Sequence, residues 1–145
     1  MMTPDEKNIL ELLQKQYSGL SWDESRPANW ELFLSGFHPE GRIIPSARPI
    51  KIMSPQDFVE RMSGLKKRGV LRSFSEQIKF YDIQVYGNVA CAIVGCEMTE
   101  NKLQVTHDIS VINLLKEQRW VIISQSWTSV SEEDCHLCGP CRAGL

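Results

Sequence analysis

The densest group of reactive side chains lies in the last eleven residues, where three cysteines stand at C-x-x-C-x-x-C spacing. The thiols of Cys135, Cys138 and Cys141, with the imidazole of His136, are ligands that suit zinc, and thiolates also hold iron–sulfur clusters. The Cys-Gly-Pro-Cys run in this segment matches the thioredoxin redox motif, but that chemistry needs a helix to lower the pKa of the first thiol. Only four residues follow the motif, so no such helix is expected. Metal or cluster ligation, redox chemistry and a plain flexible tail stay open as alternatives.

A second candidate is His107, which falls within a long strand-forming region, 71–130. An imidazole titrates near neutral pH and can act as a general base or acid when a polar partner lies within reach. The alternative interpretation is a core histidine that hydrogen-bonds a backbone carbonyl or a hydroxyl group. The sequence identifies no partner, so His107 is a candidate catalytic base rather than an assigned one.

Other side chains have the character of a ligand pocket, which in proteins is mostly apolar and aromatic with few polar groups. Trp127 lies near the end of the last predicted strand, and His38 lies in a turn whose polar groups suit the edge of a pocket. The aromatic residues on the predicted helices are also compatible with an ordinary core. The residues predicted to line a pocket are Tyr17, Trp22, Trp30, Phe33, His38, Arg42 and Trp127.

Three helices are predicted in the first half of the chain, from their start and stop signals. Thr3-Pro4-Asp5-Glu6 combines a capping residue, a proline at the first helical position and a capping box, and apolar residues then recur at helical spacing to about Ser18-Gly19. A second helix is expected from Pro27 to the turn that contains His38. A third begins at Ser54-Pro55 and ends at Gly69.

After the third helix the chain contains only strands, predicted at 71–86, 88–99, 102–116 and 119–130. The apolar residues of the first strand change parity near Tyr81-Asp82, which indicates a β-bulge and a sharp bend. A two-residue turn at Glu100-Asn101 would pair Thr99 with Lys102. That register places His107 on the buried apolar face and Asp108 on the outside, whereas a one-residue slip would bury carboxylates, which is costly.

The composition limits the function classes. The chain of 145 residues has 16 Lys and Arg, 18 Asp and Glu and a net charge of -2, unlike a basic nucleic-acid-binding protein. No stretch approaches the roughly 18 apolar residues of a membrane span, and the polar, acidic N-terminus does not resemble a signal peptide. We therefore expect a cytoplasmic protein with one domain, residues 1–131, and a cysteine-rich tail, residues 132–145. No cofactor is expected in the domain itself.

Four segments together resemble one known superfamily. They are Phe37-His38-Pro39-Glu40-Gly41-Arg42, Phe80-Tyr81-Asp82-Ile83, Val89-Ala90 and Arg119-Trp120-Val121-Ile122. Over about residues 5–130 the pattern resembles the nuclear transport factor 2-like superfamily, and more narrowly its SnoaL-like, polyketide-cyclase-related branch. The resemblance implies an α+β, cystatin-like fold, in which three N-terminal helices pack on a strongly bent antiparallel sheet to form a cone. It also implies an apolar pocket at the wide end and a homodimer formed through the outer sheet face.

Because such a fold hosts isomerases, dehydratases, cyclases and transport factors, it does not select an activity. The first hypothesis is a protein that binds a small hydrophobic molecule in the cone, with no nucleic acid or membrane as partner. The second is an isomerase or dehydratase that moves a proton on a hydrophobic carbonyl compound, with His107 as the base. The third is an interaction module whose cysteine tail binds zinc or an iron–sulfur cluster.

Overall fold

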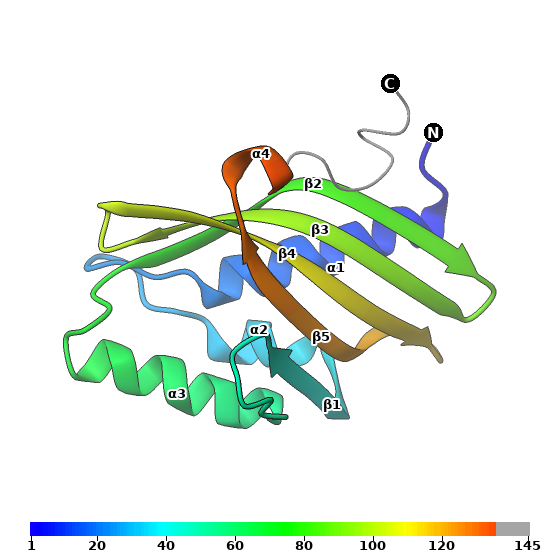
Figure 1. Cartoon of the computed structure of the whole chain (residues 1–145). Helices are drawn as coiled ribbons and strands as arrows, with labels where there is room; N and C mark the ends of the chain where they lie inside the picture. Colours follow the sequence, from blue (N-terminus) through cyan, green and yellow to red (C-terminus); the bar gives the residue numbers. More distant parts are fainter. Residues whose placement is uncertain (136–145) are drawn as a thin grey trace.

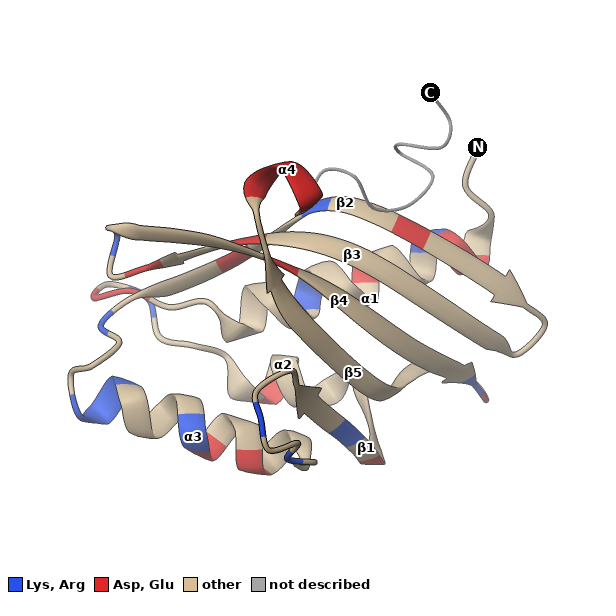
Figure 2. Ribbon diagram, viewed as in Figure 1, with Lys and Arg blue, Asp and Glu red and all other residues tan. Residues whose placement is uncertain are grey.

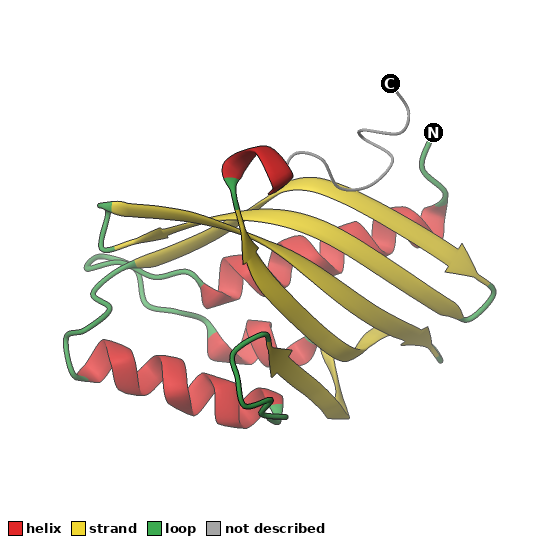
Figure 3. Cartoon of the chain, viewed as in Figure 1, coloured by secondary structure: helices red, strands yellow, loops and turns green. Residues whose placement is uncertain are grey.

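Helices cover one face of a curved five-stranded sheet, as the predicted α+β class requires (Figures 1 and 3). The computed structural model of the chain describes residues 1–135. Helices α1 (Pro4–Leu20), α2 (Trp30–Ser35) and α3 (Pro55–Lys67) lie on the inner face, and the short α4 (Glu132–Cys135) lies on the other (Figure 1). None of the described helices is long and apolar enough to cross a membrane.

The helices begin where the capping signals predict. The Thr3 hydroxyl accepts a hydrogen bond from the Glu6 N–H at 3.2 Å, and Ser54 forms a complete capping box with Asp57 at the start of α3. Helix α2 is shorter than predicted because Asn29, and not a residue near Pro27, caps it. It packs tightly on α1 at Gly19, where a Cβ would lie 2.8 Å from the backbone of α2 and its cap.

The sheet has the order β1-β5-β4-β3-β2. Four long strands confirm the prediction: β2 (Phe74–Tyr86), β3 (Val89–Glu100), β4 (Gln104–Lys116) and β5 (Trp120–Val130). The prediction of a wholly antiparallel sheet is incomplete, because β1 (Phe37–Pro45) joins the edge parallel to β5. The turn expected around His38 is therefore the irregular first part of a strand. Gly41 is required there, since a Cβ would lie 3.0 Å from the Ile122 carbonyl oxygen.

The bend of the sheet comes from a β-bulge in β2, as predicted, although not at the predicted position. Pairing with β3 shifts between Ile78 and Phe80, a few residues before Tyr81-Asp82. Beyond the bulge the inward positions change parity, which accounts for the switch in the apolar pattern. Tyr81 and Ile83 then pack on the core while the strand curves around α1.

The predicted register of β3 and β4 is wrong. Three residues separate the paired Glu100 and Gln104, instead of a two-residue turn centred on Glu100-Asn101. Asn101 and Lys102 both adopt positive φ, 53° and 60°. The Asn101 side chain accepts a hydrogen bond from the Arg72 N–H at 2.6 Å and donates to the Val70 carbonyl at 3.1 Å. These contacts attach the turn to the loop before β2, a tertiary constraint that fixes the register.

The corrected register exchanges the faces of two neighbouring residues. Asp108 pairs with Cys96 and is buried on the inner face, only 2% exposed. His107 pairs with Glu97 on the outer face, where its Nε2 lies 3.3 Å from the Glu97 carboxylate. The prediction that His107 points into the cone is therefore wrong. It rested on the assumption that the Asp108 carboxylate stays outside, whereas the structure buries that carboxylate on the inner face.

The first residues of the predicted tail pack on the domain. The thiol of Cys135, at the end of α4, is buried and donates to the carbonyl oxygens of Cys96 at 3.6 Å and Asp108 at 3.8 Å. The tail residues His136, Cys138 and Cys141 lie outside the described part of the chain, so the metal, cluster and redox interpretations stay predictions.

Candidate functional site

A cavity of about 200 Å³ lies between the sheet and the helices. Its wall is largely aromatic: Phe33 stacks on Phe58 with ring centroids 5.6 Å apart, and Phe58 meets the edge of Trp127 at 5.7 Å. Phe74 and Ile43 extend the apolar wall. A cavity of this size is smaller than the roughly 300–1,000 Å³ that drug-sized ligands occupy.

The cavity opens between α3 and the end of β3. Deep lining residues such as Phe33 and Phe58 are buried, whereas Leu65 and Met98 are half-buried and Arg61 is exposed. Arg61 and Glu100 place one charge of each sign at this mouth. The mouth is therefore polar at its rim and apolar directly behind it, an arrangement common in ligand sites.

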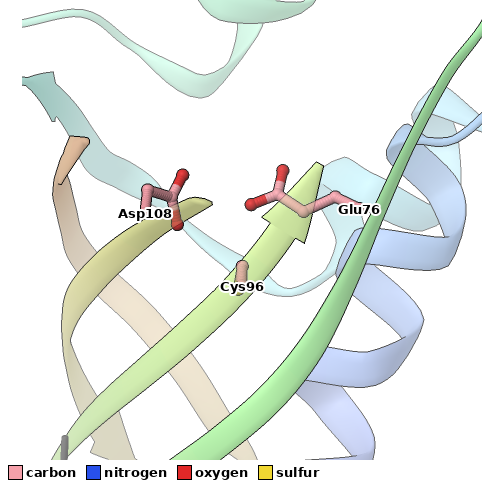
Figure 4. A group of neighbouring side chains, drawn as sticks. All are labelled: Glu76, Cys96 and Asp108. Atoms are coloured by element: carbon pink, nitrogen blue, oxygen red, sulfur yellow. The ribbon is translucent and has the colours of Figure 1, made fainter. Parts of the chain in front are cut away.

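The floor of the cavity carries two carboxyl groups. Glu76 on β2 and Asp108 on β4 point toward one another across Cys96, which lies between them on β3 (Figure 4). The Glu76 and Asp108 oxygens and the Cys96 sulfur lie within 4.8 Å of one another. One cation could contact all three atoms at this spacing.

Burial strongly affects the protonation of this floor. Loss of hydration raises the pKa of Asp108 to about 7, although the nearby His107 acts in the opposite direction. Burial, together with repulsion from Asp108, raises the pKa of Glu76 well above its usual range. Burial also raises the pKa of the Cys96 thiol and of the Tyr17 hydroxyl. Burial therefore favours the neutral, protonated forms of these groups over their charged forms.

A chain of side-chain hydrogen bonds borders the floor. The Gln16 amide donates to Gln125 Oε1 at 2.6 Å, and the Gln125 amide donates to the Tyr17 hydroxyl at 3.1 Å. Tyr17 in turn donates to Ser110 Oγ at 3.5 Å, a long hydrogen bond. None of these donors reaches Asp108, whose Oδ1 atom is buried without a hydrogen-bond partner among residues 1–135. An unpaired buried acceptor costs free energy, which a donor from a ligand would recover.

The structure brings together some of the residues predicted to line a pocket and separates others. Tyr17, Phe33 and Trp127 line the cavity. Trp22 and Trp30 pack against each other outside it, with ring centroids 5.7 Å apart. His38 accepts the Glu40 N–H through its Nδ1, and Arg42 donates to nearby carbonyls of its own strand, so neither lines the cavity.

His107, the predicted base, does not line the cavity either, and its catalytic role stays an untested prediction.

The sequence analysis missed four polar residues that line the cavity: Glu76, Asp108, Ser110 and Gln125. Glu76 had a recognisable signal, because it lies between Phe74 and Ile78 on the apolar parity of its strand. A carboxylate at such a position indicates a polar site on an inner face.

Comparison with known proteins gives a likeness in structure only. No family model matches the chain, and no curated protein matches its sequence. A protein of unknown function with a cystatin-like fold from Nostoc punctiforme is similar, with a TM-score of 0.68, 13% identity and coverage of 90% of this chain and 96% of that one.

Two further solved structures are similar over most of both chains. An NTF2-like protein of unknown function from Shewanella baltica has a TM-score of 0.62 and 16% identity, and covers 91% of this chain and 100% of its own. A hexachlorocyclohexane dehydrochlorinase, LinA-type3, from Novosphingobium barchaimii has a TM-score of 0.67 and 9% identity. The match covers 85% of this chain and 84% of that one. The narrower SnoaL-like resemblance stays a prediction. The chain has the cystatin-like fold of the nuclear transport factor 2-like superfamily.

Proposed function

We propose that the protein binds a small, mostly apolar molecule that carries at least one hydrogen-bond donor. The observation that carries this proposal is the unpaired Oδ1 atom of Asp108 at the floor of an aromatic cavity. An apolar cavity of about 150 Å³ is known to take up benzene. A cavity of about 200 Å³ is therefore suited to one ring with a short polar substituent.

Ligand-observed NMR with a panel of single-ring compounds tests this function on the full chain. In a second measurement, binding should quench or shift the tryptophan fluorescence of the chain, because Trp127 lines the cavity. Leu65→Trp should block the half-buried mouth and abolish binding, whereas Val111→Trp, on the outer sheet face, should leave it intact. Equal binding by the two variants would place the ligand elsewhere and contradict the proposal.

A second candidate function is proton transfer on a hydrophobic carbonyl compound. It is favoured by the burial that raises the pKa of Asp108 to about 7, because acid–base catalysis is most effective near the operating pH. In this version Asp108, and not His107, is the base in the cavity. Asp108→Asn should abolish turnover of a substrate while His107→Ala retains it, and the reverse result would restore the histidine.

We also propose a homodimer through the outer sheet face. Strand β5 carries no charged residue (Figure 2), and Val89, Val111 and Leu115 expose 40–54% of their surface on that side of the sheet. Sedimentation of Val111→Lys, compared with Val70→Lys in the loop before β2, tests this. Only the first should dissociate the dimer, and a monomeric unmodified chain would contradict the proposal.

A further inference from the structure

The floor of the cavity holds hydrogen-bond acceptors that its own donors do not satisfy. Asp108 Oδ1 has no hydrogen-bond partner in the part of the chain that the structure describes, and the Glu76 carboxyl faces it across the Cys96 thiol (Figure 4). The neighbouring donors of Gln16, Gln125 and Tyr17 are directed along their own chain, which ends at Ser110. A ligand that completes this floor therefore has to bring donors, and a group with several donors completes it best.

The titratable groups of the floor itself become negative when they ionise, and His107, on the outer face of β4, is the nearby group of opposite sign. On the strands the titratable groups are Glu76 on β2, Cys96 on β3 and Asp108 on β4, and β5 contributes only neutral side chains to the lining. Helix α1 contributes the neutral Tyr17. Among the described lining residues the only cationic side chain is Arg61 of α3, which is exposed at the mouth beside Glu100.

A second cleft reaches the floor from the other side. Tyr17 and Glu76 also border a polar cleft of about 390 Å³ between α1 and β2, at which Arg26 is exposed. In the described part of the chain, no ion pair joins Arg26 to Glu76. A positive charge at the cavity floor is therefore left for a ligand to supply.

The wall suits the same kind of ligand. Aromatic faces attract cations as well as apolar rings, with a cation–π energy of about 0.5–2 kcal/mol. Phe33, Phe58 and Trp127 surround the space above the carboxyl groups. An aromatic wall above an acidic floor therefore offers favourable contacts both to an ammonium group and to an apolar ring.

We propose that the cavity selects a small primary or secondary amine in its protonated form, with one ring against the aromatic wall. The inference rests on the proposed function, whose donor-bearing ligand it specifies. The ammonium N–H groups donate to Asp108 Oδ1 and to the Glu76 carboxyl, and the ring fills the space beside Phe58. Near neutral pH the ammonium ion enters, a carboxyl proton leaves to solvent, and an ion pair remains. Binding therefore releases up to one proton.

Matched pairs of ligands test the proposal by calorimetry on the full chain. Benzylamine and 2-phenylethylamine are compared with benzyl alcohol and 2-phenylethanol, which have the same ring and length without the charge. At pH 8 the amine of a pair should bind about tenfold more tightly or better, as a charge-assisted hydrogen bond warrants. Amine affinity should fall by up to about tenfold per pH unit below the pKa of the carboxyl group. The binding heat should differ between phosphate and Tris buffers because a proton is released.

Two variants locate the selectivity. Asp108→Asn should abolish the preference for amines while the alcohols still bind. Glu97→Gln, which alters a carboxylate on the outer face beside His107, should leave the preference unchanged. If alcohols bind as tightly as amines, the amine inference is wrong and the proposed function stands. If neither member of any pair binds, both fail.

Discussion

Asp108→Asn is expected to stabilise the folded chain by about 2–4 kcal/mol at pH 8 and to leave its stability at pH 4 nearly unchanged. Burial raises the pKa of Asp108 from 3.8 to about 7 in the folded state. Between these two pH values the folded chain binds more protons than the unfolded chain. The contribution of Asp108 to the free energy of unfolding therefore falls as the pH rises from about 4 to about 7, and is constant above that. Asparagine keeps the shape of the side chain and does not ionise, so it avoids this loss.

Urea denaturation at pH 4, 6 and 8 measures the effect, with the slope of the transition as a check that the unfolded state has not changed. Asp82→Asn, on the outer side of the edge strand β2, is the matched control and should not alter the pH dependence. If the unmodified chain were as stable at pH 8 as at pH 4, ionisation of the buried Asp108 carboxyl would not destabilise the fold, and the prediction would be wrong. A stabilised variant that binds no amine would identify Asp108 as a group kept for function at the expense of stability.

Gln125→Leu is expected to destabilise the fold by about 2–4 kcal/mol, because it removes the centre of a buried hydrogen-bond chain. The Gln125 amide accepts from Gln16 at 2.6 Å and donates to Tyr17 at 3.1 Å, and both glutamines are almost fully buried. Leucine leaves the Gln16 amide N–H groups without their acceptor in an interior where water cannot replace it. Gln16 Oε1 already lacks a hydrogen-bond partner among the described residues, so the remaining side chain would be left unsatisfied by them.

The double variant Gln16→Leu/Gln125→Leu should recover most of the lost stability, since apolar side chains of similar size replace both partners. Chemical denaturation of both single variants and the double variant gives the coupling energy, expected at about 1–3 kcal/mol. Gln84→Leu, at an exposed position of β2, should change stability by less than about 0.5 kcal/mol. Strictly additive losses would show that the hydrogen bond between the two amides contributes nothing.

Elements with signals in nearby residues were predicted correctly from the sequence, whereas pairings between distant segments were not. Capping residues and helical periodicity act within a few residues, and they located α1 and α3 correctly. The strand prediction was also right in length, and the parity change in β2 correctly indicated a bulge. The parallel pairing of β1 with β5 leaves no local signal, because the partners are far apart in the chain.

The register error has a different cause. Strand β4 is apolar on both faces: Ile112 and Leu114 point inward, while Ile109 and Val111 point outward. The alternation of apolar residues therefore could not show which face of β4 is buried. The prediction chose the register that keeps Asp108 exposed, because burying a carboxylate is costly, and that choice was wrong. A binding site is where a chain accepts such a cost, so the residue that violated the rule is the one that marks the site.

The parallel pairing of β1 with β5 also has a kinetic consequence. Hairpins β2–β3 and β3–β4 close between neighbouring segments, whereas β1 and the carbonyl of Gly36, which accepts the Ile122 N–H at 2.8 Å, must wait for the last strand. Contacts between distant segments form late, because the closure entropy of a long loop has to be overcome first. Trp127 and Gln125 belong to that last strand, so no partly folded intermediate that lacks β5 contains the complete cavity. A ligand of the kind proposed for the cavity would therefore bind only after the final folding step, when β5 is in place.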